Sequence, residues 1–176
     1  MLVFETERLV VKRFTQEDAH HFFLLNSSEQ VMHFIRPVKN RQQSDAFLAE
    51  NMAFYLDNSC LGRFAVFEKF SLDFVGTFSF LYLSGEADFH LGYALLPGAW
   101  GKGFATELVS AGIPYFFDHS GKSSIFAITH ADNGPSQQVL LKCGFYRQGQ
   151  ILQNGEILEL FMINSETTGL KGTRHE

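Results

Sequence analysis

The stretch of chain richest in chemical information runs from Leu91 to Glu107 and reads LGYALLPGAWGKGFATE. An apolar, strand-like run leads into a loop that contains Gly101 and Gly103, and a helical pattern follows directly. Glycine lets backbone amides approach a bulky anion, and the N-terminus of a helix adds unpaired N–H groups and a favourable dipole. The segment therefore predicts a site for a phosphate or pyrophosphate group.

The spacing of these glycines excludes the two common nucleotide-binding motifs. The third glycine of the dinucleotide fingerprint is missing, and no Gly-x-x-x-x-Gly-Lys-Ser/Thr run forms a Walker loop. A Gly-x-Gly sequence alone is equally typical of an ordinary turn at the start of a helix. The anion must therefore be identified from a longer part of the chain.

The longer pattern resembles a known enzyme family. Gly92 to Glu107 fits, position by position, the run Gly-Tyr-x-x-x-Pro-x-x-Trp-Gly-x-Gly-x-Ala-Thr-Glu. This run is characteristic of one branch of the GNAT N-acetyltransferases, the ribosomal-protein N-terminal alanine acetyltransferases of the RimJ/RimL type. Trp100 stands where the wider superfamily has Gln or Arg. A second block, Asn133 to Phe145, is similar to the family's Asn-x-x-Ser helix followed by Gly-Phe, and Glu5 to Arg13 is a weaker third match.

The resemblance implies acetyl-CoA (coenzyme A) as the cofactor. Backbone groups of Leu95 and Leu96 would pair with the pantetheine amides, and an N–H near Leu95 could stabilise the oxyanion. Asn133 would hydrogen-bond the pantetheine arm, Ser136 would lie near the sulfur, and the loop amides would take the pyrophosphate. The cofactor-binding residues implied in this way are Leu95, Leu96, Trp100, Gly101, Lys102, Gly103, Phe104, Ala105, Thr106, Asn133 and Ser136.

The same resemblance suggests a donor for the leaving thiolate. In this family the amine attacks the thioester directly, without a covalent enzyme intermediate. Many members carry a Tyr seven residues after the Asn to protonate the thiolate, and that position is Leu140 here. Ser136 is then the first candidate for the acid or hydrogen-bond donor. A satisfied hydroxyl at the start of a helix explains Ser136 equally well.

Two side chains are candidates for the base that receives the amine proton. His90 stands two residues before Gly92, where the branch often has Glu, and a histidine with a pKa near 6.5 could accept a proton directly or through water. Glu159 matches an acidic position common in the branch. A hydrogen-bonded interior residue is the alternative for His90, and Glu107, in the first turn of a helix, is interpreted as structural.

The elements that must position these residues predict one α+β (mixed α/β) domain over 1–163, followed by a polar tail over 164–176. Strands are expected at 8–14, 63–67, 75–81, 88–95, 124–129, 146–151 and 157–163, and helices near 15–25, 28–34, 44–56, 105–116 and 136–142. The resemblance implies the GNAT fold, a central, mostly antiparallel twisted sheet with splayed central strands and flanking helices. It also implies that the strand ending at Leu95 splays from the strand near Tyr146–Ile151.

Composition bounds the remaining possibilities. A chain of 176 residues suits one domain with its own core. The net charge is −5, and no Lys/Arg run resembles a phosphate-backbone footprint, so direct nucleic-acid binding is not expected. Cys60 and Cys143 are expected to be buried free thiols, and no metal site is expected because ligand-spaced Cys/His/carboxylate clusters are missing. Without a long apolar stretch, we expect a cytoplasmic protein with no membrane partner.

Three functions remain open. The leading hypothesis is an N-acetyltransferase that moves the acetyl group of acetyl-CoA directly to a primary amine, with the N-terminal α-amine of a protein or peptide favoured. A small-molecule amine (an amino acid, a polyamine or a drug) is the second acceptor class, since the branch contains such enzymes. A catalytically silent acyl-CoA-binding protein is the third. Phe34 and other aromatic residues could line an acceptor cleft or pack in the core. The sequence is compatible with either a monomer or a homodimer.

Overall fold

The computed structural model describes residues 1–57, 60–83 and 88–166. The strands are Leu2–Glu5 (β1), Leu9–Arg13 (β2), Gly62–Glu68 (β3), Phe74–Tyr82 (β4), Phe89–Leu95 (β5), Ser124–His130 (β6), Tyr146–Gln153 (β7) and Glu156–Asn164 (β8). The α-helices are Ala19–Asn26 (α1), Glu29–Met32 (α2), Arg41–Ala53 (α3), Phe104–Ser120 (α4) and Gly134–Lys142 (α5). Short 3-10 turns occupy Gln16–Asp18 (η1), Phe54–Asp57 (η2) and Pro97–Ala99 (η3).

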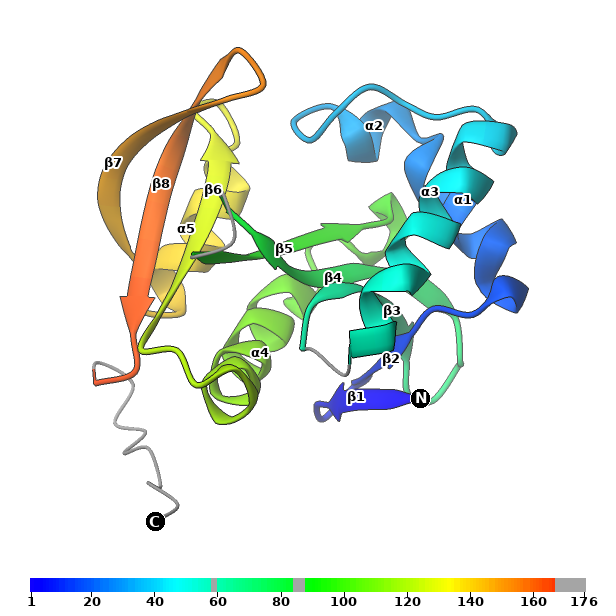
Figure 1. Ribbon diagram of the computed structural model, residues 1–176, viewed down its shortest axis with the longest axis horizontal. Coiled ribbons are helices and arrows are strands. Elements are labelled where there is room, and N and C mark those ends of the chain that lie inside the picture. The colour runs from blue at the N-terminus through cyan, green and yellow to red at the C-terminus, as the bar shows by residue number, and fades with distance from the viewer. Residues whose placement is uncertain (58–59, 84–87, 167–176) are drawn as a thin grey trace.

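The eight strands form one sheet in the order β1-β2-β3-β4-β5-β6-β8-β7 (Figure 1). Only β5 and β6 pair in parallel; the other neighbouring strands of the described sheet pair antiparallel. This confirms the expected α+β class with a mostly antiparallel sheet. The sequence does not predict β1, because the strand has only four residues and no alternation of apolar and polar residues continues beyond Glu5.

The sheet order corrects one expectation. The neighbour of β5 at the centre of the sheet is β6, and the strand at Tyr146–Gln153 lies at the far edge beyond β8. The chain leaves β5, passes through α4 and returns beside β5 as β6, which is how a helical crossover joins two parallel strands. The hairpin of β7 and β8 then adds to the free side of β6, with β8 inside.

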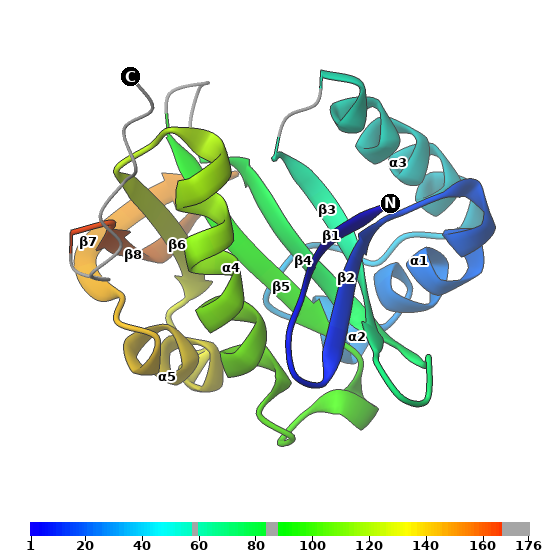
Figure 2. The ribbon, with the colours of Figure 1, turned by 90° about the horizontal axis from the view of Figure 1, so that it is seen from below.

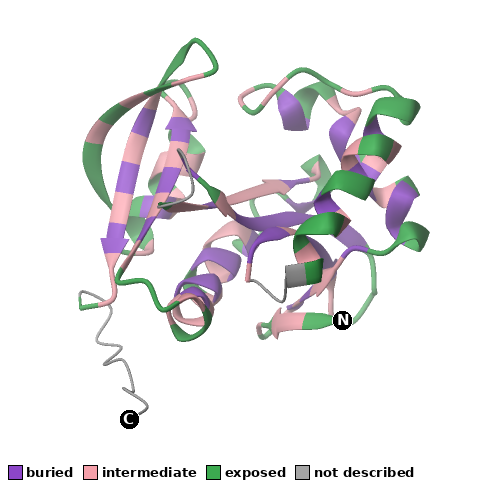
Figure 3. Cartoon of the chain, in the orientation of Figure 1, coloured by how far each residue is buried: buried purple, intermediate pink, exposed green. Residues whose placement is uncertain are grey.

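The sheet separates two hydrophobic layers. Helices α4 and α5 cover one face, and α1, α2 and α3 cover the other (Figures 1 and 2). Alternation along the strands divides the side chains between the layers: Phe64 and Val66 pack towards α4, whereas Ala65 packs towards α1 and α3. The same alternation appears as bands of buried and half-buried residues along β6 and β8 in Figure 3.

The two central strands separate soon after they meet. β5 and β6 pair only at His90–Phe126 and Leu91–Ala127, while β5 continues to Leu95. In Figure 1 the two strands leave this short contact in different directions. The carboxyl half of β5 therefore has a sheet partner on the β4 side alone.

The last strand reaches Asn164, one residue into the segment that the sequence predicts as a tail, and Ser165 N–H still donates to Ser123 O at 2.9 Å. The rest of that predicted tail, from residue 167, lies outside the described residues. Among the helices that are described, none is long and apolar enough to cross a membrane.

Candidate functional site

The glycine loop ends in a helix whose first amides are uncapped by side chains. Gly101 and Gly103 have φ angles of 73° and 80°, in the left-handed region that favours glycine. Gly103 is the N-cap of α4, and no side chain within the described residues caps this end of the helix. The N–H groups that begin α4 thus have no intrahelical partners, and the 17-residue helix adds its dipole. This geometry suits a phosphate or pyrophosphate group.

Glu107, in the first turn of α4, ties this loop to the N-terminal segment. Its Oε1 accepts from Thr6 Oγ1 at 2.5 Å and from Arg8 N–H at 2.9 Å, and its Oε2 accepts from Arg8 Nε at 2.7 Å. Arg8 Nη1 also donates to Lys102 O at 3.0 Å, and the Arg8 guanidinium lies 4.7 Å from the centre of the Phe104 ring. A carboxylate with this many donors positions the loop, in agreement with a structural interpretation of Glu107.

The surroundings of Glu107 also set its charge. Burial acts to raise the pKa of Glu107, but the hydrogen bonds from Thr6 and Arg8 and the positive charge of Arg8 outweigh burial, so the pKa is lowered. The carboxylate is therefore ionised throughout the neutral range.

Backbone groups of β5 face the gap between the central strands. Leu96 N–H donates to Val75 O at 2.9 Å, so the Leu96 amide is engaged with the β4 side. Because these groups alternate along an antiparallel pair, the backbone N–H and C=O of Tyr93 and Leu95 point away from β4. The Leu95 C=O accepts from Trp100 Nε1 at 2.7 Å. The Leu95 N–H points to where β6 no longer pairs, so it could bind an extended ligand or an oxyanion.

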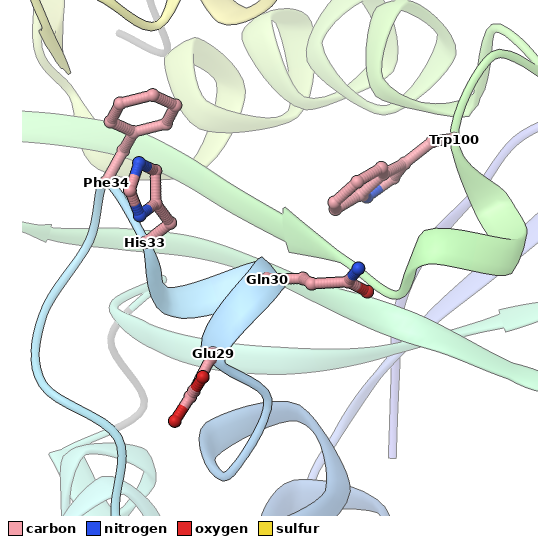
Figure 4. A pocket seen from close by; sticks show the side chains of 5 residues that line it. All are labelled: Glu29, Gln30, His33, Phe34 and Trp100. Atoms are coloured by element: carbon pink, nitrogen blue, oxygen red, sulfur yellow. The ribbon is translucent and has the colours of Figure 1, made fainter.

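A cavity of about 460 Å³ opens beside this gap (Figure 4). Its walls come from α2 and the segment after it on one side, and from the glycine loop on the other. The lining residues are Glu29, Gln30, His33, Phe34 and Trp100. Phe34 also stacks on His130, at the end of β6, with ring centres 5.2 Å apart. The segment after α2 thus spans the opening between the central strands, and Trp100, 51% exposed, forms the opposite wall.

Ser136 meets a residue that the sequence reasoning did not select. Asn133 Oδ1 caps α5 by accepting from Ser136 N–H at 3.3 Å, and Ser136 Oγ lies 3.0 Å from Tyr93 OH. Burial raises the pKa of Tyr93 to about 12, although the hydrogen bond with Ser136 acts in the opposite direction. Tyr93 therefore keeps its proton in the neutral range. The Gly-Tyr pair in the motif was the available signal for Tyr93, but its contact with Ser136 depends on the packing of α5 against β5.

His90 and Glu159 are held in different surroundings, away from this hydroxyl pair. Alternation places His90 on the α3 side of β5, opposite Tyr93. Burial lowers the pKa of His90 to about 4; the Arg63 charge acts in the same direction, and a hydrogen bond with the Tyr82 backbone acts against both. Nδ1 of His90 is buried and has no hydrogen-bond partner among the described residues.

Glu159, on β8, is 6% exposed and already paired. Its Oε2 accepts from Arg147 Nη1 at 2.6 Å and its Oε1 from Gln150 Nε2 at 3.0 Å. Arg147 also donates to Gln137 Oε1, on α5, at 3.0 Å. The structure therefore joins Ser136 to Tyr93, and it does not bring His90 or Glu159 into hydrogen-bond contact with that pair. Their catalytic roles stay predictions, as do the cofactor contacts of the loop.

Known proteins are similar to this chain in sequence and in fold. The family model described as Acetyltransferase (GNAT) domain matches residues 8–146. The curated protein "Uncharacterized N-acetyltransferase YoaA" of Bacillus subtilis is 28% identical over 154 residues, which cover 86% of each chain.

Two solved structures share the fold at lower identity. The ribosomal-protein-S5-alanine acetyltransferase from Vibrio fischeri superimposes with a TM-score of 0.73 and 22% identity, over 93% of this chain and 96% of that one. The spermidine N-acetyltransferase from Vibrio cholerae, in complex with CoA and spermine, gives a TM-score of 0.76 and 18% identity, over 90% and 96%.

The link between Glu107 and the N-terminal segment gives a first prediction. We expect Glu107→Gln to remove the ionic hydrogen bonds of Arg8 and lower the melting temperature at pH 7 by roughly 2–8 °C. The pKa of Glu107 is lowered in the folded protein, so its stabilisation is complete above the unfolded carboxyl pKa and lost as pH falls through the folded value. Thermal melts of both proteins should therefore converge as the pH falls below about 4.3.

Glu7→Gln is the matched control, because Glu7 is an exposed carboxylate in the same N-terminal turn. It should change the melting temperature little at either pH. An equal loss in both variants, or a Glu107→Gln loss that does not depend on pH, would contradict the role assigned to Glu107.

Proposed function

Because the chain belongs to the Acetyltransferase (GNAT) domain family, we propose that it acetylates the N-terminal α-amine of a protein or peptide. Membership of the family makes the chain an N-acetyltransferase with acetyl-CoA as the acyl donor. The acceptor is the proposed part. The observation that carries it is the state of the two candidate bases: Glu159 is paired with Arg147 at 2.6 Å, and burial of His90 lowers its pKa to about 4.

The residues of the site fit acetyl-CoA. The N–H groups at the start of α4 suit the pyrophosphate, and the Leu95 N–H faces the gap where a pantetheine arm could pair as an extended strand. Asn133 Oδ1 is used in capping α5, so its amide nitrogen is the group left for the pantetheine arm. Acetyl-CoA supplies an activated acyl thioester, and the gap between the strands positions it for direct attack by an amine.

The pair of Ser136 and Tyr93 would act on the leaving sulfur. Tyr93 stays protonated in the neutral range, so its hydroxyl can donate to Ser136 Oγ across their 3.0 Å contact. The Ser136 hydroxyl proton is then free to point towards the sulfur. Two uncharged hydroxyls can stabilise a thiolate by hydrogen bonding, so no charged side chain has to be buried beside the sulfur. A thiol with a pKa of about 8.5 needs no stronger acid to leave.

The base determines which amine the site can use. A terminal α-amine has a pKa of about 7.7–8.0, so roughly a tenth of it is neutral at pH 7, whereas a lysine amine at about 10.4 is almost wholly protonated. His90 is a weak base because of its low pKa, and Glu159 is held by Arg147. A site with these groups favours an amine that loses its proton readily. This supports an α-amine over a lysine side chain or a polyamine.

The cavity supports a second candidate, a small-molecule amine. Its volume of about 460 Å³ lies within the range of sites for small ligands, about 300–1,000 Å³.

A thiol-release assay with acetyl-CoA separates the candidates when N-terminal peptides, free amino acids and polyamines are compared. Release with peptides supports the proposal, release with polyamines alone overturns it, and CoA binding without release from any amine would favour a silent binder.

The hydroxyl pair gives a second prediction. We expect Ser136→Ala and Tyr93→Phe each to lower kcat by roughly ten- to a hundredfold, because each removes stabilisation of the leaving thiolate. The KM for acetyl-CoA should change little. The two hydroxyls act in series, so the double variant should lose no more kcat than the more impaired of the two single variants. Steady-state kinetics at saturating acetyl-CoA would measure these effects.

Tyr82→Phe is the control, since Tyr82 is an exposed tyrosine on β4 and should keep full kcat. Strictly multiplicative losses in the Ser136 and Tyr93 variants would show that the hydroxyls do not act as a unit.

The pH dependence gives a third prediction. The reactive amine is neutral, so kcat/KM should rise with pH and level off above the pKa of the acceptor, about 7.7–8.0 for a peptide α-amine. With His90 neutral down to a pKa of about 4, His90→Gln should leave the midpoint of this rise unchanged. Profiles with two peptides of different α-amine pKa would test whether the midpoint follows the acceptor. If the rise of kcat/KM with pH were lost in the His90→Gln variant, His90 would instead be established as the base.

A further inference from the structure

Three positive side chains surround one phenylalanine ring on the α3 side of the sheet. The guanidinium carbons of Arg36 and Arg63 lie 4.9 and 4.6 Å from the centre of the Phe47 ring, and Lys39 Nζ lies 4.8 Å from it. Arg36 and Lys39 belong to the segment between α2 and α3, Arg63 to β3 and Phe47 to α3. All four residues are half-buried, so part of each remains accessible to solvent.

None of these three charges is paired directly with a described carboxylate, although Glu50, on α3, acts on Arg63 from a longer distance. Arg36, Lys39 and Arg63 take part in no ion pair with any described residue. Arg36 Nη2 donates to Asn26 Oδ1 at 2.8 Å, and its Nε is buried without a described partner. Arg41, nearby on α3, differs in this respect, because it stacks on Phe23 and is neutralised by Asp45 at 2.9 Å.

The cost of this arrangement is visible in the ionisation of the two arginines. Burial lowers the pKa of Arg36. Burial lowers the pKa of Arg63 to about 10, and the neighbouring Arg36 charge acts in the same direction, while Tyr55 and Glu50 act against both. Like charges that are desolvated together without a direct ion-pair partner destabilise a fold, and such clusters favour binding of the opposite charge.

The cluster lies on the face of the sheet that carries His90. Arg63 is opposite Ser79, and Ser79 is opposite Gly92, so the three residues share one face of the sheet. The same face carries His90, whose pKa responds to Arg63. Two strand spacings, about 10 Å, separate the backbone of Arg63 from β5. The glycine loop leads instead into α4, which packs on the opposite face, so the cluster is separate from the phosphate site.

We propose that Arg36, Lys39 and Arg63 form a subsite for a carboxylate of the acceptor, an acidic side chain near the N-terminus of the peptide whose α-amine is acetylated. This inference rests on the proposed function. An extended peptide advances about 3.3 Å per residue, so a carboxylate in the first few residues after the reacting amine can cross the distance from β5 to Arg63. The carboxylate of a free amino acid, on the same carbon as the amine, is too close to the amine to do so.

The subsite predicts an acceptor preference that can be measured with matched peptides. Peptides with Ala first and Asp at the second, third or fourth position should be compared with peptides that carry Asn there. At the best position we expect the Asp peptide to have a kcat/KM higher by roughly ten- to a hundredfold. Arg63→Gln and Arg36→Gln should reduce this Asp/Asn ratio towards one, with little effect on the Asn peptide. Lys39→Gln is the milder variant if the arginine variants unfold.

Arg41→Gln is the matched control, because Arg41 also stacks on an aromatic ring but already has a carboxylate partner. It should keep the Asp/Asn ratio of the unchanged protein. Thermal melts of all variants would separate loss of the subsite from loss of the fold. Higher salt should lower the ratio, since attraction between partly exposed charges is screened.

A binding experiment separates this inference from the proposed function. N-acetylated Asp and Asn peptides cannot react, and calorimetry in the presence of CoA reports their affinities without turnover. Tighter binding of the Asp peptide that is lost in Arg63→Gln supports the subsite, even if no peptide releases thiol and the proposed function fails. Equal affinities and equal kcat/KM for Asp and Asn peptides would overturn the subsite while leaving peptide acetylation intact. A stronger preference for a free acidic amino acid would also overturn it.

Discussion

The separation of β5 from β6 is the constraint on which the rest of the structure depends. The two strands pair at two positions only, so the carboxyl half of β5 presents backbone groups to a gap. Buried backbone groups must find partners, and Trp100 provides one by donating to Leu95 O. The remaining groups suit an extended ligand that enters between the strands. The start of α4, the start of α5 and the segment after α2 all border this gap.

Holding the gap open requires attachments that are distant in sequence. Glu107 joins the start of α4 to Thr6 and Arg8, so the glycine loop is attached to the N-terminal turn. On the other side, Arg147 joins Glu159 to Gln137 and so ties the outer hairpin to α5. These two ionic networks fix the walls, while the hydroxyls of Tyr93 and Ser136 between them remain uncharged. The carboxylate of Glu159 is buried and engaged in this attachment, and its role in proton transfer stays a prediction.

Local patterns were sufficient to predict the glycine loop, the long helix after it and most strands, because turn chemistry and hydrophobic periodicity act within a few residues. Pairing between distant segments has no such local signal. Local patterns therefore do not predict the contact between Tyr93 and Ser136. The neighbour of β5 expected from the resemblance, the strand at Tyr146, is also wrong, because β6 occupies that place. The cluster of Arg36, Lys39 and Arg63 was missed for the same reason, since its members meet only when α3 packs against β3. The resemblance, which extends over most of the chain, supplied the fold that local patterns could not.

Charge is distributed unequally on the two faces of β5, and this bears on the reaction itself. In the proposed reaction, the thiolate would leave towards a neutral hydroxyl pair, and the amine would arrive on the face where Arg63 acts to lower the pKa of His90. The same positive field disfavours an ammonium ion and so favours the neutral, nucleophilic form of any amine bound there. Together with the modest pKa of an α-amine, this field would reduce the need for a strong base in the proposed reaction.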